Sequence, residues 1–223
     1  YEYSILSAMQ SIDVEYLKDN ADFALGIVTG NNEKYIHNER IENAEPVLRG
    51  SDIYKYVHGN SKQFIVFEPK KFQQVAPVEL YRASEKLLYR FICDSLVFAY
   101  DDNQTLTLNS GNILIPHIFG MEIKYVLAVL NSRAAQFYFK LANNSIKVLR
   151  SHIETIPIPK VSIIDQNNII KLVNKIIQTK DLKMIAEIYD EIDECIMKAY
   201  RLSTDYVSYI EKKTHTNNLF LRQ

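Results

Sequence analysis

The spacing of the hydrophobic positions changes near residue 160. From there on, apolar residues recur every three or four positions over 169–177 and again over 182–199. Residues at this spacing share one face of a helix. The pattern predicts two helices that pack together as a hairpin. A third, short helix is expected over 202–212, with Ser203 as its N-cap.

The first 160 residues carry shorter apolar segments, which are typical of strands. Two buried strands are predicted over 22–29 and 63–69. Two more are expected over 95–102 and 106–116, on either side of an Asp-Asp-Asn turn. The other expected elements are a short helix within 45–56 capped by Ser51 or Asp52, a half-buried helix over 78–92 and a long helix over 121–142.

Pro157 and Pro159 mark the end of this first region, because neither residue can continue a helix. Its mixture of strands and helices predicts an α/β (α+β) domain over residues 1–160, with a mixed or antiparallel sheet. Residues 161–223 are predicted to form a helical hairpin or bundle that braces this domain and docks further protein, or else a terminal hairpin without a partner.

Composition supports a globular protein of one domain with a smaller appendage. The chain has 223 residues, of which 47% are hydrophobic and 24% charged. The net charge is −1, but it is unevenly spread: residues 49–150 hold 13 basic and 8 acidic side chains, whereas residues 1–45 hold 3 and 9. A basic middle beside an acidic arm fits a surface that faces a polyanion. Solvated faces of uneven charge explain it equally well.

Cys93 and Cys195 lie in apolar surroundings and are interpreted as reduced core residues, which favours a cytoplasmic protein. There is no Cys-x-x-Cys motif and the histidines lack ligand spacing, so no metal site is predicted. No apolar segment has transmembrane length, and no membrane partner is expected.

Familiar catalytic motifs are absent from the sequence. The turn at Gly30 lacks the Gly-Lys-Ser/Thr of a phosphate-binding loop, and no dinucleotide fingerprint, nucleophile elbow or zinc-protease motif occurs. Asp101 and Asp102 are interpreted as a hairpin turn rather than as metal ligands. We predict no catalytic residue and no cofactor-binding residue in this chain.

The order of several short motifs is more specific than any one of them. These are GIVTGNN (26–32), EPVLRGSDIYKY (45–56), FIVFEP (64–69), EKLLYRFICDSLVFAYDDNQTLTLNSGNILIP (85–116), YVLAVLNSRAAQFYFK (125–140) and LRSHIETIPIP (149–159). In this order they resemble the TaqI-like C-terminal specificity domain of adenine-specific DNA methyltransferases and type IIG restriction-modification enzymes. The segment 189–212 also resembles the helical end of such enzymes.

The resemblance implies a target recognition domain that binds double-stranded DNA for a restriction-modification enzyme, a bacterial defence system. In this family an upstream methyltransferase domain, sometimes fused to an endonuclease, carries the S-adenosylmethionine pocket and an Asn-Pro-Pro-Tyr motif. This sequence has no Asn-Pro-Pro and no methyltransferase glycine motif. We therefore expect no cofactor here and no methylation or cleavage by this chain alone, and we interpret Tyr1 as a truncation point.

Three other interpretations stay open. A self-standing specificity subunit of type I systems is an alternative setting for the same fold. A protein-interaction module without DNA contact predicts no salt-dependent DNA binding. An enzyme with an unrecognised site predicts a deep pocket with clustered, perturbed ionisable groups.

Sequence-specific DNA binding requires arginine and amide side chains for base edges, and cations, hydroxyls and backbone amides for phosphates. The predicted loops and strand ends supply such groups. The DNA-binding candidates are Thr29, Asn31, Asn32, Lys34, Arg49, Ser51, Lys55, Lys62, Lys70, Lys71, Asn109 and Asn112.

Some roles have two interpretations at this point. Gly30 either turns a plain hairpin or belongs to a DNA-facing turn, since Gly and Asn tolerate positive φ. Arg49 either contacts DNA or pairs with Asp52 three residues on. Arg133 is interpreted as structural. Aromatic residues at helical spacing are assigned to the core: Tyr125, Phe137, Tyr138 and Phe139.

Overall fold

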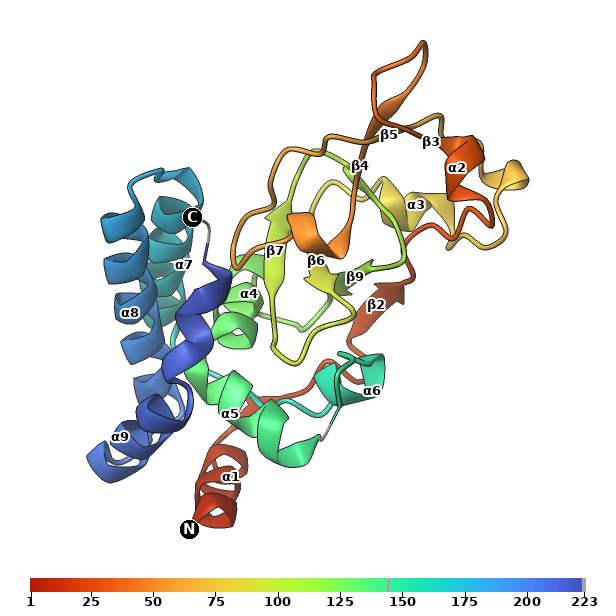
Figure 1. The fold of residues 1–223 in the computed structure, drawn as a ribbon. Coiled ribbons are helices and arrows are strands. Elements are labelled where there is room, and N and C mark those ends of the chain that lie inside the picture. Colours follow the sequence, from red (N-terminus) through yellow and green to blue (C-terminus); the bar gives the residue numbers. More distant parts are fainter. Residues whose placement is uncertain (144, 222–223) are drawn as a thin grey trace.

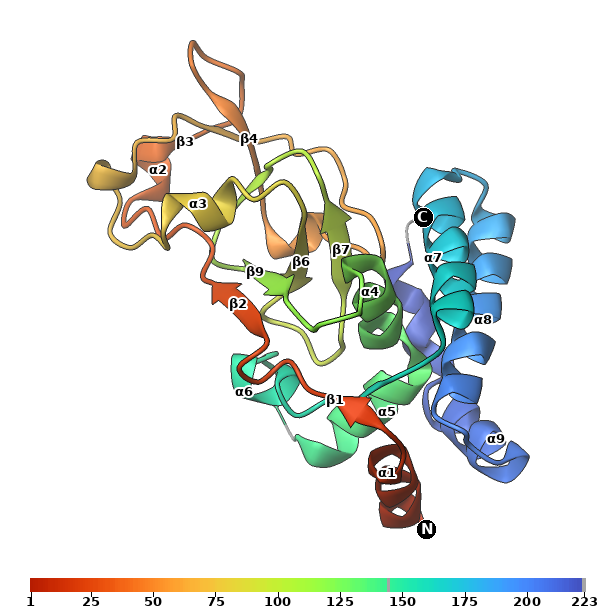
Figure 2. The same cartoon turned by 180° about the vertical axis from the view of Figure 1, so that it is seen from behind.

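The computed structural model describes residues 1–143 and 145–221. The two four-stranded sheets lie together at one side of the molecule, and the C-terminal helices pack at the other side (Figure 1). Seen from behind, helix α4 (Ile123–Asn131) lies between the sheets and helix α7 (Ile163–Gln178) (Figure 2). Within the described residues, no helix combines the length and apolar character needed to cross a membrane.

The main sheet has four antiparallel strands in the order β2-β9-β6-β7. Its centre is strongly apolar, since Leu88 pairs with both Ile113 and Ala99 and all three are buried. Its strands are β2 (Ala21–Ala24), β6 (Lys86–Arg90), β7 (Phe98–Asp101) and β9 (Gly111–Pro116).

A second sheet has the order β3-β5-β4-β8, and only its β4–β8 pair is parallel. Strands β1 (Val14–Glu15) and β10 (Ile158–Pro159) form a small antiparallel pair. The predicted α/β class with a mixed or antiparallel sheet is therefore confirmed. The strands of the second sheet are β3 (Ile36–His37), β4 (Glu45–Leu48), β5 (Phe64–Ile65) and β8 (Leu106–Thr107).

The three predicted C-terminal helices are confirmed as α7, α8 and α9. Ser203 is the N-cap of α9, and its hydroxyl accepts a hydrogen bond from the Tyr206 backbone N–H (3.3 Å). The division at residue 160 stays a prediction, and one hydrophobic cluster runs from the main sheet through α4 into α7 and α8. The remaining helices are α1 (Glu2–Ser11), α2 (Asn32–Tyr35), α3 (Val78–Tyr81), α5 (Arg133–Ala142), α6 (Arg150–Ile153), α8 (Leu182–Ala199), α9 (Thr204–Lys213) and the 3-10 helices η1 (Gly50–Asp52), η2 (Pro69–Lys71) and η3 (His215–Phe220).

The helix predicted over 78–92 is wrong. Only the four residues of α3 are helical, and the rest forms β6, the strand that lies between β9 and β7. A strand covered on both faces has a continuous apolar segment, which has no period-two signature to separate it from a helix. Lys86 enters this buried strand because its ammonium donates to the Asp101 carboxylate at 2.6 Å.

The hairpin interpretation of 101–103 is also wrong. β7 pairs with β6, while β8 pairs with β4, so the turn does not join two neighbouring strands. Asp101 is buried and accepts hydrogen bonds from Lys86, Thr105 and His58. Burial raises the Asp101 pKa, but the His58 hydrogen bond and the Lys86 charge outweigh burial and hold that pKa well below its usual range.

Other boundaries differ in smaller ways. Residues 45–56 begin as strand β4 and continue into η1, whose N-cap is Arg49 rather than Ser51 or Asp52. The long helix over 121–142 is two helices that break at Ser132, which caps α5. The aromatic residues assigned to the core are buried there. Cys93 and Cys195 are half-buried free thiols beside the same core.

Candidate nucleic-acid interface

Two chain segments, 28–37 and 64–76, are joined into what we call the loop lobe. Val28 and Gln74 exchange two backbone hydrogen bonds, at 2.9 and 3.0 Å. The rings of Tyr35 and Phe72 meet edge to face with their centres 5.4 Å apart. These contacts bring the Gly30 turn beside Gln73, which closely follows η2, and Figure 1 shows α2 close to β3.

The loop lobe holds six of the predicted residues, and five of them are exposed. Asn31 caps α2, with its side-chain oxygen accepting from the Lys34 N–H at 3.1 Å. Gly30 has φ +79° and leads into α2, so the plain hairpin interpretation of this turn is wrong. Glu68 forms an ion pair with Lys71 (2.7 Å). The five residues are Asn31, Asn32, Lys34, Lys70 and Lys71.

A second exposed group surrounds η1. The Gly50 N–H donates to the Ser110 hydroxyl (2.9 Å), which brings Ser51 close to Asn109. Arg49 donates its Nε–H to the Gln63 side chain at 2.5 Å, next to Lys62. The Asp52 carboxylate accepts from the Arg49 backbone N–H instead of from the guanidinium. The second group therefore comprises Arg49, Ser51, Lys62 and Asn109.

Three predicted DNA contacts are buried and are corrected here. The Thr29 hydroxyl is 2.5 Å from Asn32 Oδ1 and accepts from the Asn31 N–H, so it shapes the turn from inside. The Asn112 side chain accepts from the Gly26 N–H at 3.1 Å and fixes the end of β9. Lys55, only 2% exposed, does not reach the surface.

Lys55 instead joins the sheet region to the helices. Its ammonium donates to the Asn131 carbonyl (3.1 Å) and to the Tyr189 hydroxyl (3.3 Å). The Asn131 side chain in turn bonds both the N–H and the carbonyl of Phe98 in β7. Burial lowers the Lys55 pKa to about 7, although the charge of Asp193 opposes that shift.

Arg133 has the structural role assigned to it from the sequence. Its guanidinium donates to Asp193 (3.0 Å) and to Asp190 (2.9 Å), which ties α5 to α8. Exposed acidic side chains continue along α8 at Glu187, Glu191 and Glu194. This face is therefore acidic, and such a face is unfavourable for phosphates.

Sequence reasoning missed several exposed amides. Gln73 and Gln74 lie in the loop lobe, with Gln73 beside Gly30, and only Phe72 separates them from the Lys70–Lys71 pair, which is a signal that was present. The half-buried Gln63 directly follows Lys62, but its link to Arg49 spans 14 residues and has no local signal.

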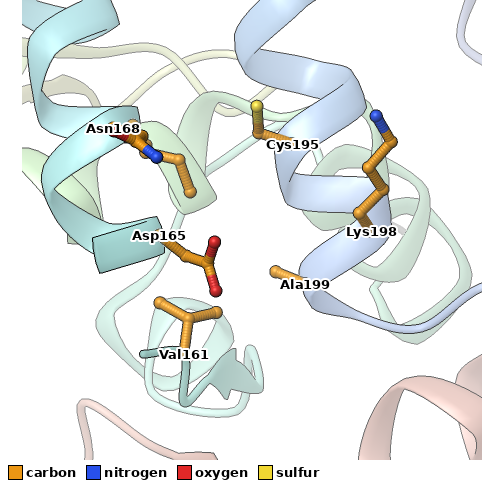
Figure 3. A pocket seen from close by; sticks show the side chains of 7 residues that line it. Val161, Asp165, Asn168, Cys195, Lys198 and Ala199 are labelled. Carbon is orange, nitrogen blue, oxygen red and sulfur yellow. The ribbon is translucent and has the colours of Figure 1, made fainter. Parts of the chain in front are cut away.

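A cavity of about 220 Å³ lies between α7 and α8. Figure 3 shows the Asp165 carboxylate directed into it, whereas the Lys198 side chain points away. Val161, Ile169 and Cys195 also line it. The ionisable residues of its lining are Asp165, Cys195 and Lys198, and none of the predicted DNA-binding residues belongs to it.

The fold and its two exposed groups define a recognition-type α/β domain with helices at its C-terminal side. The sequence matches the TaqI-like C-terminal specificity domain over residues 45–158, and the chain belongs to this family. It is a specificity domain of the restriction-modification kind. The match runs from β4 to β10 and includes η1 and η2. No curated protein matches the sequence.

Two solved structures share the fold. One is the HsdS subunit from Thermoanaerobacter tengcongensis, with 14% identity and a TM-score of 0.50 over 90% of this chain and 50% of that chain. The other is the type IIL restriction-modification enzyme MmeI in complex with DNA, with 8% identity and a TM-score of 0.53 over 89% of this chain and 36% of that chain. This chain spans half the length of the first and about a third of the second.

Proposed function

We propose that this chain is the duplex-DNA recognition domain of an adenine-N6 DNA methyltransferase in a type II or IIG restriction-modification system. The observation that carries the proposal is the loop lobe, where Asn31, Asn32, Lys34 and Lys70 are exposed together. Within the described residues, no salt bridge neutralises Lys34 or Lys70. Such groups suit phosphates and base edges, and the aromatic packing beneath them keeps the loops in place.

In this proposal the chain binds the duplex and positions the target site, and an upstream domain of the same cytoplasmic polypeptide carries out the methyl transfer. That domain binds S-adenosylmethionine and receives the flipped adenine. The cavity between α7 and α8 does not suit that cofactor, because its lining offers one carboxylate and no glycine-rich turn. An endonuclease fused to the methyltransferase belongs to the type IIG version of the proposal.

The shared fold with HsdS over 90% of this chain favours a second candidate, a type I-like specificity subunit. Both candidates recognise DNA, and they differ in whether the methyltransferase lies on the same polypeptide. Methylation of plasmid DNA by the full-length gene product alone supports the first candidate. Methylation that requires a separate methyltransferase subunit supports the second.

Fluorescence anisotropy with pooled random duplex DNA at stepped salt concentrations tests DNA recognition itself. We expect affinity to fall steeply with salt, and the Lys70→Ala/Lys71→Ala variant to lower the slope by up to about 0.9 for each lysine that contacts a phosphate. The matched control is Lys171→Ala/Lys175→Ala, which removes two exposed lysines from α7. Absence of salt-dependent binding, or an equal loss in the control, would contradict the proposal.

A further inference from the structure

Arg49 is an exposed residue with a fixed backbone, at the connection between β4 and η1. Its N–H donates to the Asp52 carboxylate at 2.7 Å, and its carbonyl accepts from the Asp52 N–H at 3.0 Å. These two bonds close a small ring around η1. The Cα–Cβ direction of Arg49 is therefore set before any ligand arrives.

The backbone of Gln63 is fixed from the same strand. Its N–H donates to the Ser61 hydroxyl (2.9 Å), and its carbonyl accepts from the Val47 N–H (3.0 Å). Val47 lies two residues before Arg49 in the chain. The separation between Arg49 and Gln63 is therefore defined by β4 itself.

The two side chains meet in one orientation. Arg49 Nε–H donates to Gln63 Oε1 at 2.5 Å, and Gln63 Nε2 donates to Asn38 Oδ1 at 3.3 Å. The amide of Gln63 thus uses its oxygen toward Arg49 and its nitrogen toward Asn38. Among the described residues, no hydrogen bond or salt bridge holds the two terminal nitrogens of Arg49. This edge of the guanidinium is the one that donates two parallel bonds to paired acceptors.

A groove of about 500 Å³ lies beside this pair, with Leu48 and Ser61 in its wall. It is also lined by Asn60, Asn103 and Gln104, whose side chains end in amides. Arginine pairs with guanine and amides pair with adenine in the major groove of DNA. The groove therefore offers amide side chains close to Arg49, together with apolar ones such as Pro46 and Phe64.

We infer that Gln63 is a positioning residue, which directs the Arg49 guanidinium to a bidentate acceptor on duplex DNA. The inference rests on the proposed function. Two acceptors share this chemistry: the oxygens of a phosphate, and the O6 and N7 atoms of guanine. Lys34, Lys62 and Lys70 lack such a fixed fork and act as point charges.

Affinity, salt slope and base preference of the 223-residue chain distinguish the two acceptors, with bound duplexes sequenced from a randomised pool. A phosphate contact predicts that Arg49→Ala lowers the slope of log affinity against log salt by about 0.9, while Arg49→Lys retains it and base preference is unchanged. A guanine contact predicts that both variants lose a preference of about 5- to 150-fold for guanine at one position.

The role of Gln63 is tested by combining variants. Gln63→Leu keeps the volume near that of glutamine and removes the bond to Nε. We expect it to weaken binding in the wild-type background and to have no further effect in Arg49→Ala. Equal weakening in both backgrounds would overturn the positioning role, because Gln63 would then act without Arg49. Thermal unfolding of each variant controls for loss of the fold.

The remaining outcomes separate this inference from the proposed function. If the wild-type chain binds DNA and Arg49→Ala matches it in affinity, salt slope and base preference, the inference is overturned while the proposed function stands. If the wild-type chain shows no salt-dependent binding at low salt, both are overturned.

Discussion

Different kinds of interaction stabilise the loops of the sheet region and the C-terminal helices. The loop lobe and η1 consist of elements of two to four residues, and side-chain hydrogen bonds help to fix them: Asn31 to Lys34 in the lobe, and Ser110 to Gly50 and Asp52 to Arg49 at η1. Helices α7 and α8 have 16 and 18 residues, and buried apolar stripes pair them. The sheet region therefore adds separate polar anchors in its loops to its apolar core, whereas the helices use one repeated apolar face.

This difference explains where recognition chemistry is placed. A helix surface must follow the register of its buried stripe, so its exposed positions are fixed in spacing. A loop that carries its own anchor can change its exposed residues without disturbing the next loop. The sheet region can therefore present amides and cations from unrelated segments, while the helices supply a stable support.

The largest loss of stability is expected from removing a buried charge in the sheet region. Asp101→Ala leaves the Lys86 ammonium buried without its carboxylate, and we expect the free energy of unfolding to fall by about 3–5 kcal/mol. Asp102→Ala, at the exposed neighbouring position, is the matched control. Ile192→Val, which trims the apolar stripe of α8, is expected to cost about 0.5–1.5 kcal/mol. Urea unfolding measures all three, and an Asp101→Ala effect below that of Ile192→Val would refute the contrast.

The junction between the two regions is predicted to depend on polar contacts as well. Tyr189→Phe removes the hydroxyl that donates to the Asn131 carbonyl and accepts from Lys55. We expect a loss of about 1–3 kcal/mol, because the buried ammonium loses one partner. Tyr206→Phe on the half-buried side of α9 is the control. Equal stabilities for Tyr189→Phe and the wild type in urea would show that apolar packing alone holds the junction.

Stability against pH sharpens the same point. The Lys55 pKa is lowered from 10.5 to about 7 in the folded chain, so between these values the unfolded chain binds more protons and stability rises with pH. Lys55→Met removes this contribution. The free energy of unfolding of the wild type, minus that of Lys55→Met, should therefore increase from pH 7 to pH 9, by at most about 1.4 kcal/mol per pH unit. A constant difference would mean that Lys55 titrates normally.

The helices could be predicted because their signal is local. The stripes of α7 and α8 and the cap at Ser203 depend on residues within one or two turns. Strand β6 could not be separated from a helix, since its burial comes from β9 and β7, which follow later in the chain. The parallel pairing of β4 with β8 likewise depends on distant partners.

The candidate site was predictable in residue type and less so in placement. Lys55 and Lys70 look alike in the sequence, yet one is buried and the other exposed. What decides this is partners 76 and 134 residues away from Lys55. The Arg49–Gln63 pair has the same origin, because strand pairing sets it rather than a motif.

The pairing of early strands with late ones also bears on how the chain folds. β1 pairs with β10 and β2 pairs with β9, so Val14 meets Pro159 and Ala21 meets Pro116. During synthesis these first strands have no partners until the later ones have left the ribosome. Contacts that join such distant parts of a sequence slow folding, because the intervening chain must be ordered first. Formation of the β1–β10 and β2–β9 pairs is therefore expected to be slow and to limit the overall folding rate.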